Sequence, residues 1–161
     1  MTIKVGDKVP SVKLKYKTDD GIKDVMTDEL FAGKKVVLFA LPGAFTPTCS
    51  AKHVPGFVQN FDALKKKGVD EIWCFAVNDP FVMGAWSRDQ KAGGKIRFMA
   101  DGSADYTKKL GLELDLTARG LGMRCNRFSM LVDDGVVKTL NVEAPGKFEV
   151  SNAETMLTQL G

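Results

Sequence analysis

Cys49 is the residue whose setting in the sequence most clearly indicates chemistry. It follows the turn residues Pro42-Gly43 and lies three positions after Thr46. Thr46 is expected to cap a helix and Pro47 to be its first residue, where the missing N–H of proline costs nothing. Cys49 then lies in the first helical turn, where unpaired N–H groups and the helix dipole favour the thiolate over the thiol. The pattern predicts a nucleophilic cysteine rather than a structural one.

Three classes of function use such a cysteine: a redox thiol, a cysteine hydrolase or acyltransferase, and a thioredoxin-like binding or redox-sensor domain. His53 lies four residues after Cys49, on the same helical face, where it could act as the base of a Cys/His pair. A lone histidine in an amphipathic helix more often packs or forms local hydrogen bonds. Lys52 stands where a C-x-x-C disulfide oxidoreductase has its second thiol. These residues alone do not decide among the three classes.

The elements expected around Cys49 alternate between strands and helices. Residues 36–41 form an apolar run typical of a strand covered on both faces. An amphipathic helix follows and ends at Lys65-Lys66-Lys67-Gly68, with a bend at Pro55. Further strands are expected at 71–77, 96–100, 127–132 and 136–142, and helices after residue 80, at 104–110 and after a capping box at 151–154. This order predicts an α/β, thioredoxin-like fold, with a mixed central sheet and helices on both faces.

Length and composition indicate one soluble domain spanning residues 1–161, because 44% of the residues are apolar. The net charge of +3 is too small and too interspersed to indicate a nucleic-acid partner. No apolar run approaches the roughly 20 residues that a membrane span needs. The first ten residues resemble neither a secretion signal nor a transit peptide, so we expect a cytoplasmic protein, or an organellar one whose targeting segment has been removed.

The cysteines and the single histidine also limit the cofactor chemistry. Cys49, Cys74 and Cys125 are an odd set without a C-x-x-C pair, so a disulfide scaffold cannot pair them all and a reducing compartment fits better. The scattered thiols and the lone His53 do not provide the four clustered ligands of a closed zinc site. We therefore expect no metal centre.

A longer motif around Cys49 resembles a known family. The segment Pro42-Gly-Ala-Phe-Thr46-Pro-Thr-Cys49 is similar to the P-x-x-x-T-x-x-C active-site signature of the peroxiredoxins. Further similarity to the type II, peroxiredoxin-5-like branch, closest to its plant-like members, extends over nearly the whole chain and is carried by residues 50–57, 77–82, 111–116, 120–122 and 126–130. The resemblance implies a thioredoxin-like fold and thiol-dependent reduction of hydrogen peroxide and alkyl hydroperoxides, without metal or flavin.

The resemblance also implies roles for four residues. Cys49 is expected to be the peroxidatic thiol, Thr46 the hydroxyl beside it, Pro42 the lid over the pocket and Arg127 the cation. Attack on a peroxide moves negative charge onto the departing oxygen, so donors must be aimed at that atom. Arg127 provides a permanently charged fork of N–H groups, and a threonine hydroxyl can both donate and accept. Pro42 has no N–H of its own and can exclude water.

The cysteine that reduces the oxidised Cys49 is harder to assign. Animal members of the branch have a resolving cysteine near the C-terminus, but Val150 stands in the corresponding stretch. Cys74 matches the second cysteine of plant-like members, yet a bond to Cys49 would need the two Cα atoms within about 7 Å. Local unfolding of the Cys49 helix is therefore expected for that route. Cys125 lies two residues before Arg127 and could approach the pocket, although no family role is known there.

The simplest scheme uses an external reductant, either glutathione with glutaredoxin or a thioredoxin. The family likeness also favours a noncovalent homodimer. Phe45, Phe81 and the segment 80–83 are expected to form an apolar rim beside the pocket, as a dimer contact or as ordinary core. The alternatives remain a redox-sensor or binding domain and a Cys49/His53 hydrolase.

Overall fold

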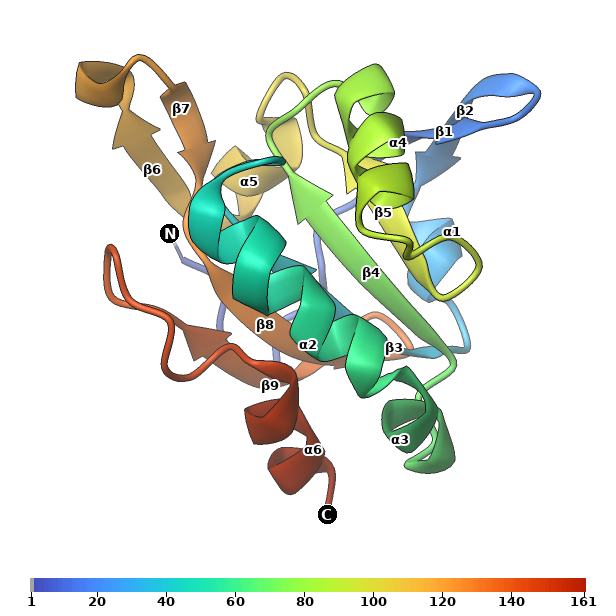
Figure 1. The fold of residues 1–161 in the computed structure, drawn as a ribbon. Helices are drawn as coiled ribbons and strands as arrows, with labels where there is room; N and C mark the ends of the chain where they lie inside the picture. The colour runs from blue at the N-terminus through green and yellow to red at the C-terminus, as the bar shows by residue number, and fades with distance from the viewer. Residues whose placement is uncertain (1) are drawn as a thin grey trace.

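The computed structural model describes residues 2–161 and shows an α/β fold built on a mixed sheet (Figure 1). Within this range, seven strands form the main sheet in the order β2-β1-β5-β4-β3-β8-β9, and β6 pairs with β7 in a separate hairpin. The strands are β1 (Lys13–Thr18), β2 (Gly21–Met26), β3 (Lys35–Ala40), β4 (Glu71–Ala76), β5 (Ile96–Ala100), β6 (Glu113–Leu116), β7 (Gly122–Cys125), β8 (Phe128–Asp133) and β9 (Val136–Val142). The helices are α1 (Thr27–Phe31), the π-helical η1 (Cys49–His53), α2 (Val54–Gln59), α3 (Phe61–Lys66), α4 (Pro80–Asp89), α5 (Asp105–Leu110), the 3₁₀ turn η2 (Thr117–Arg119) and α6 (Ala153–Leu160).

Strand β3 lies in the middle of the sheet, parallel to β4 and antiparallel to β8. Its side chains alternate between the two faces, with Val37 and Phe39 in one core cluster and Val36 and Leu38 in the other. Helices α2, α3, α4 and α6 cover the face that bears Phe39, whereas α1 and α5 cover the opposite face (Figure 1). The end of β3 leads directly into the loop before Cys49, so a rigid central strand positions that loop.

The predicted fold class is confirmed, with a mixed central sheet and helices on both of its faces. Three local expectations were wrong or incomplete. The last helix is capped by Asn152, whose side chain accepts from the Thr155 N–H, and not by Ser151. The sequence did not indicate the hairpin of β6 and β7, whose second strand begins at Gly122. The sequence also did not indicate the hairpin of β1 and β2.

Candidate active site

Cys49 is fully buried at the start of a helix whose first turns are irregular. Residues 47–59 form one helical segment, which begins where the Ser50 N–H donates to the Thr46 carbonyl over 3.0 Å. Cys49 is therefore in the first turn, as the sequence predicts. The bend expected at Pro55 is preceded by a π-helical turn over Cys49–His53, in which the Val54 N–H reaches the Cys49 carbonyl five residues back. Such turns often mark functional sites.

Arg127 places its guanidinium directly against the Cys49 sulfur. Its Nη2 donates to Cys49 Sγ over 3.2 Å, and the residue is only 8% exposed. Arg127 immediately precedes β8, the strand that pairs with β3. The pairing of β3 with β8 thus brings together two residues that are 78 positions apart in the chain. A hydrogen bond from a charged donor is stronger to a thiolate than to a thiol, so this contact favours the anionic sulfur.

His53 holds the other side of the guanidinium, and both of its ring nitrogens have partners other than the sulfur. Arg127 Nη1 lies 2.8 Å from His53 Nδ1, and His53 Nε2 lies 3.0 Å from the Ser151 carbonyl. Arginine can only donate, so Nδ1 must accept and Nε2 must carry the ring proton. Burial, followed by the charge of Arg127, lowers the pKa of His53 to about 3. His53 is a neutral residue with both nitrogens occupied, which is not the arrangement of a base for Cys49.

The loop between β3 and the helix is held by hydrogen bonds from two directions. The Ala44 N–H donates to the side-chain oxygen of Asn78 over 2.9 Å, and Asn78 follows strand β4. Thr46 donates its hydroxyl proton to the Gly43 carbonyl over 2.6 Å. Phe45 adopts a left-handed backbone with φ of 63° and is 54% exposed. A bulky residue rarely adopts this conformation, so the surrounding contacts must hold the loop in its shape.

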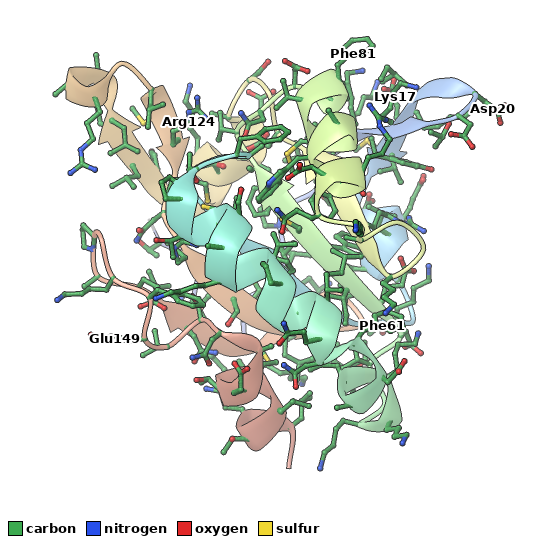
Figure 2. All side chains as sticks on the ribbon, in the orientation of Figure 1. Lys17, Asp20, Phe61, Phe81, Arg124 and Glu149 are labelled. Carbon is green, nitrogen blue, oxygen red and sulfur yellow. The ribbon has the colours of Figure 1, made fainter. Side chains whose placement is uncertain are left out.

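Arg124, in the β6–β7 hairpin, also contacts this loop. Figure 2 shows it beside the segment that enters η1. Its Nε donates to the Leu121 carbonyl over 2.8 Å and its Nη1 donates to the Pro42 carbonyl over 3.3 Å. A Cβ atom at Gly43 would lie 2.6 Å from Arg124 Nη1. Position 43 therefore leaves room for this arginine to reach Pro42.

Cys74 and Cys125 lie on opposite faces of the main sheet. Cys74, on β4, is buried in the same core cluster as Cys49. Burial raises the pKa of the Cys74 thiol well above its usual value, and the Cys49 sulfur raises it further. Cys125 lies in the other core cluster, where burial likewise raises the pKa of its thiol. The expected approach of Cys125 to the pocket is not seen, because the sheet separates its sulfur from Cys49.

The structure brings together Cys49 and Arg127 and places Pro42 and Thr46 on the loop that leads to Cys49. Sequence reasoning missed Asn78 and Arg124, and it treated His53 as a candidate base. Spacing along the chain gave no signal for these contacts, because each joins residues from different elements. Within residues 2–161, no cluster of three or more His, Cys, Asp or Glu side chains is arranged to hold a metal ion.

Comparisons of the sequence and of the fold with known proteins agree on one family. A model of the Redoxin family matches residues 4–157. The chain is 52% identical to Peroxiredoxin-2B of Arabidopsis thaliana over 159 residues, covering 98% of each chain. The structure of reduced Prx3 in complex with hydrogen peroxide from Vibrio vulnificus superposes with a TM-score of 0.96 at 53% identity, covering 99% of this chain and 100% of that one. The structure of peroxiredoxin 5 from Alvinella pompejana has a TM-score of 0.87 at 34% identity, covering 98% of this chain and 97% of that one.

The names of the relatives do not agree on a cellular compartment. They include Peroxiredoxin-2E, chloroplastic, of Arabidopsis thaliana, with 51% identity over 99% of this chain and 70% of the relative. They also include Peroxiredoxin-2F, mitochondrial, of Oryza sativa, with 48% identity over 82% of this chain and 67% of the relative. In the described part of the chain, no helix combines the length and the apolar character needed to cross a bilayer.

Proposed function

The chain belongs to the peroxiredoxin family, in its type II branch, and is a thiol-dependent peroxidase, and we propose that Cys49 is the sulfur that attacks the peroxide. The observation that carries the proposal is the 3.2 Å contact between Arg127 Nη2 and Cys49 Sγ. A nucleophilic sulfur and a fixed cation occupy one buried site, and among the described residues no carboxylate lies within 4 Å of that cation. Its positive charge is therefore available to the thiolate and to the reacting oxygens.

The proposed reaction moves one oxygen onto the sulfur. A lone pair of the Cys49 thiolate attacks the nearer peroxide oxygen, the O–O bond breaks, and its electron pair leaves on the farther oxygen. Sulfur is oxidised to the sulfenic acid, and the departing oxygen takes a proton to become water or an alcohol. Arg127 donates to the sulfur before attack and to the reacting oxygens as negative charge moves onto them.

Thr46 and Pro42 are proposed to position the peroxide. The Thr46 hydroxyl proton is engaged by the Gly43 carbonyl, so its oxygen is free to accept the proton of the bound peroxide. Pro42 offers no competing N–H, and its carbonyl is tied to Arg124. Because Cys49 is fully buried, we propose that the peroxide reaches the sulfur past this loop, which leads directly to Cys49.

We propose that an external thiol reduces the sulfenic acid, since Cys74 and Cys125 are both fully buried and burial raises the pKa of each thiol. Glutathione with glutaredoxin, or a thioredoxin, is the proposed reductant, and no prosthetic cofactor takes part. One thiol displaces water from the sulfenic acid to form a mixed disulfide, and a second thiol releases reduced Cys49. Cys74 is the secondary candidate for resolution. It would require the start of the Cys49 helix to unfold and its own thiol to deprotonate.

Peroxide consumption with dithiothreitol tests the proposal in the wild type and three single Cys→Ser variants. Cys49→Ser should abolish turnover, whereas Cys74→Ser and Cys125→Ser should retain it. Cys125→Ser is the matched control, because that thiol is equally buried on the far side of the sheet. Undiminished turnover in Cys49→Ser would refute the assignment. The mass of the peroxide-treated protein distinguishes a sulfenic acid from a Cys49–Cys74 disulfide and from a mixed disulfide with glutathione.

We also propose that the protein acts as a single domain and as a noncovalent homodimer in the cytoplasm, or in an organelle if a targeting segment has been removed. Phe45 and Phe81 are 54% and 64% exposed, so they are not ordinary core and are available for a partner surface. Figure 2 shows Phe81 at the outer end of α4. Sedimentation of the wild type and of Phe81→Ser tests the contact, since the variant should shift toward monomer. A wild-type monomer at high concentration would refute it.

A further inference from the structure

The cation beside Cys49 is held through a chain of hydrogen bonds that leads to the C-terminal loop, residues 143–152. Arg127 donates to His53, and His53 donates to the Ser151 carbonyl. The position of the Ser151 carbonyl therefore determines where the neutral His53 ring lies, and the ring in turn orients the guanidinium. Since the ring carries no charge, it orients Arg127 without neutralising it.

The C-terminal loop is organised around one buried carboxylate, that of Glu143. Glu143 is 3% exposed and accepts bonds of 2.8 to 2.9 Å from the backbone N–H groups of Glu149, Val150 and Ser151. The Ser151 hydroxyl donates to the same carboxylate over 2.7 Å. Glu149 itself is exposed on the loop between β9 and α6 (Figure 2). The convergence of these donors on one side chain fixes the turn that presents the Ser151 carbonyl to His53.

Glu143 is linked to Arg127 by two further routes. Its backbone N–H donates to the Arg127 carbonyl over 3.0 Å. The ring of Phe148, which the loop carries, lies 4.9 Å from the His53 ring and 5.6 Å from the Arg127 guanidinium carbon. A cation over an aromatic face at this distance is attracted to it. The loop thus contacts both the arginine and the histidine that orients it.

We propose that Glu143 is a positioning residue for the peroxidatic site, because its carboxylate shapes the loop that fixes His53 and, through it, Arg127 against Cys49. The inference rests on the proposed roles of Cys49 and Arg127. In Glu143→Gln the amide oxygen can replace Oε2, but the NH₂ group then replaces Oε1 and faces the Glu149 N–H, and the loop loses the negative charge on which its donors converge, so the turn would loosen. The Ser151 carbonyl would then leave the His53 ring, and the guanidinium would lose its fixed orientation.

Glu143→Gln tests the proposal, with Asp101→Asn as the matched control. Asp101 is also 3% exposed and accepts from the N–H groups of Tyr106 and Thr107 and from the Thr107 hydroxyl, but it has no link to Arg127. Both variants should lose stability in urea. Only Glu143→Gln should lower kcat/KM for peroxide, by about 10- to 100-fold, because a displacement of about 1 Å in a catalytic group can cost about 10²-fold. It should also slow the alkylation of Cys49 by iodoacetamide at a fixed pH.

Nitrogen NMR gives an independent readout, because His53 is the only histidine in the chain. The wild type should show a single neutral tautomer with the proton on Nε2, and Glu143→Gln should show a mixture of tautomers. If Glu143→Gln does not fold, Ser151→Ala can replace it, because it removes one hydrogen bond to the carboxylate. This variant should change kcat/KM and the His53 tautomer in the same direction by a smaller amount. Unchanged kcat/KM and tautomer in folded Glu143→Gln would overturn the inference, as would an equal loss of kcat/KM in Asp101→Asn. Failure of the peroxidatic assignment is separate and would appear as turnover in Cys49→Ser.

Discussion

Lowering the pH from 7 to 5 should destabilise the folded protein through His53. This histidine has a pKa of about 3 in the folded protein, against 6.5 for an unperturbed histidine. The unfolded chain therefore binds a proton between these values that the folded protein does not bind. Stability from this residue is fully present above pH 6.5 and falls as the pH drops toward 3. At pH 5 the expected loss is about 2 kcal/mol, since each pH unit below 6.5 costs about 1.4 kcal/mol.

Urea unfolding, followed by the fluorescence of the buried Trp73 and Trp86, measures this loss at pH 7, 6 and 5. Both proteins carry Cys49→Ser, so that the active-site thiol is absent from the comparison, and His53→Gln in that background keeps a donor and an acceptor without a titrating ring. The carboxylates contribute equally to both proteins, so the difference between their pH slopes reports His53. The protein that retains His53 should lose about 2 kcal/mol more between pH 7 and 5. Equal slopes, or a gain in stability on acidification, would show that His53 is not held neutral.

Two further predictions concern the loop before Cys49 and the buried thiols. Gly43→Ala should lower stability by about 0.5 to 1.5 kcal/mol, the net contribution of one hydrogen bond, because its Cβ would displace the flexible end of the half-buried Arg124 from the Pro42 carbonyl. In an Arg124→Ala background the same substitution should cost almost nothing, so an additive double-mutant cycle in urea would contradict the steric explanation. In the native protein at pH 8, Cys74 and Cys125 should react with a thiol reagent only at the rate of unfolding, because burial raises the pKa of both thiols. Rapid modification of either one, detected by peptide mass, would contradict their burial.

The parts of the fold that the sequence predicts are those with strong local signals. The apolar run at residues 36–41 alternates between two cores, and the strands expected at 127–132 and 136–142 correspond to β8 and β9. Strands β1 and β2 were missed because only Leu14 among their residues is buried, so their side chains show no clear apolar face. The π-helical turn at Cys49–His53 has no signature in residue type, since its irregular bonding depends on the packing around it.

The residues of the candidate site also divide into those with a local sequence signal and those without one. Cys49 was selected by its expected place at a helix start, whereas Thr46 and Pro42, within eight residues of sequence, received their roles from the resemblance of this segment to the P-x-x-x-T-x-x-C signature. Arg127 was selected by resemblance alone, and its contact with the sulfur depends on the pairing of β3 with β8. His53 was weighed as a base because its spacing places it on the helical face of Cys49. That spacing could not show that Arg127 and Ser151, distant in sequence, would occupy both nitrogens of its ring.

Whether the Arg127 charge activates Cys49 is decided by the rate at which peroxide oxidises Cys49 in a single turnover, compared between wild type and Arg127→Gln. The Gln side chain loses the permanent charge, so the second-order rate constant should fall by about 10² to 10³, as when a preorganised donor is removed from a catalytic site. Arg97→Gln is the control for net charge, because Arg97 lies on β5 and pairs with Glu71. Arg97→Gln should react at a rate close to that of the wild type. A wild-type rate in folded Arg127→Gln, or an equal fall in both variants, would contradict the role of Arg127 in activating Cys49.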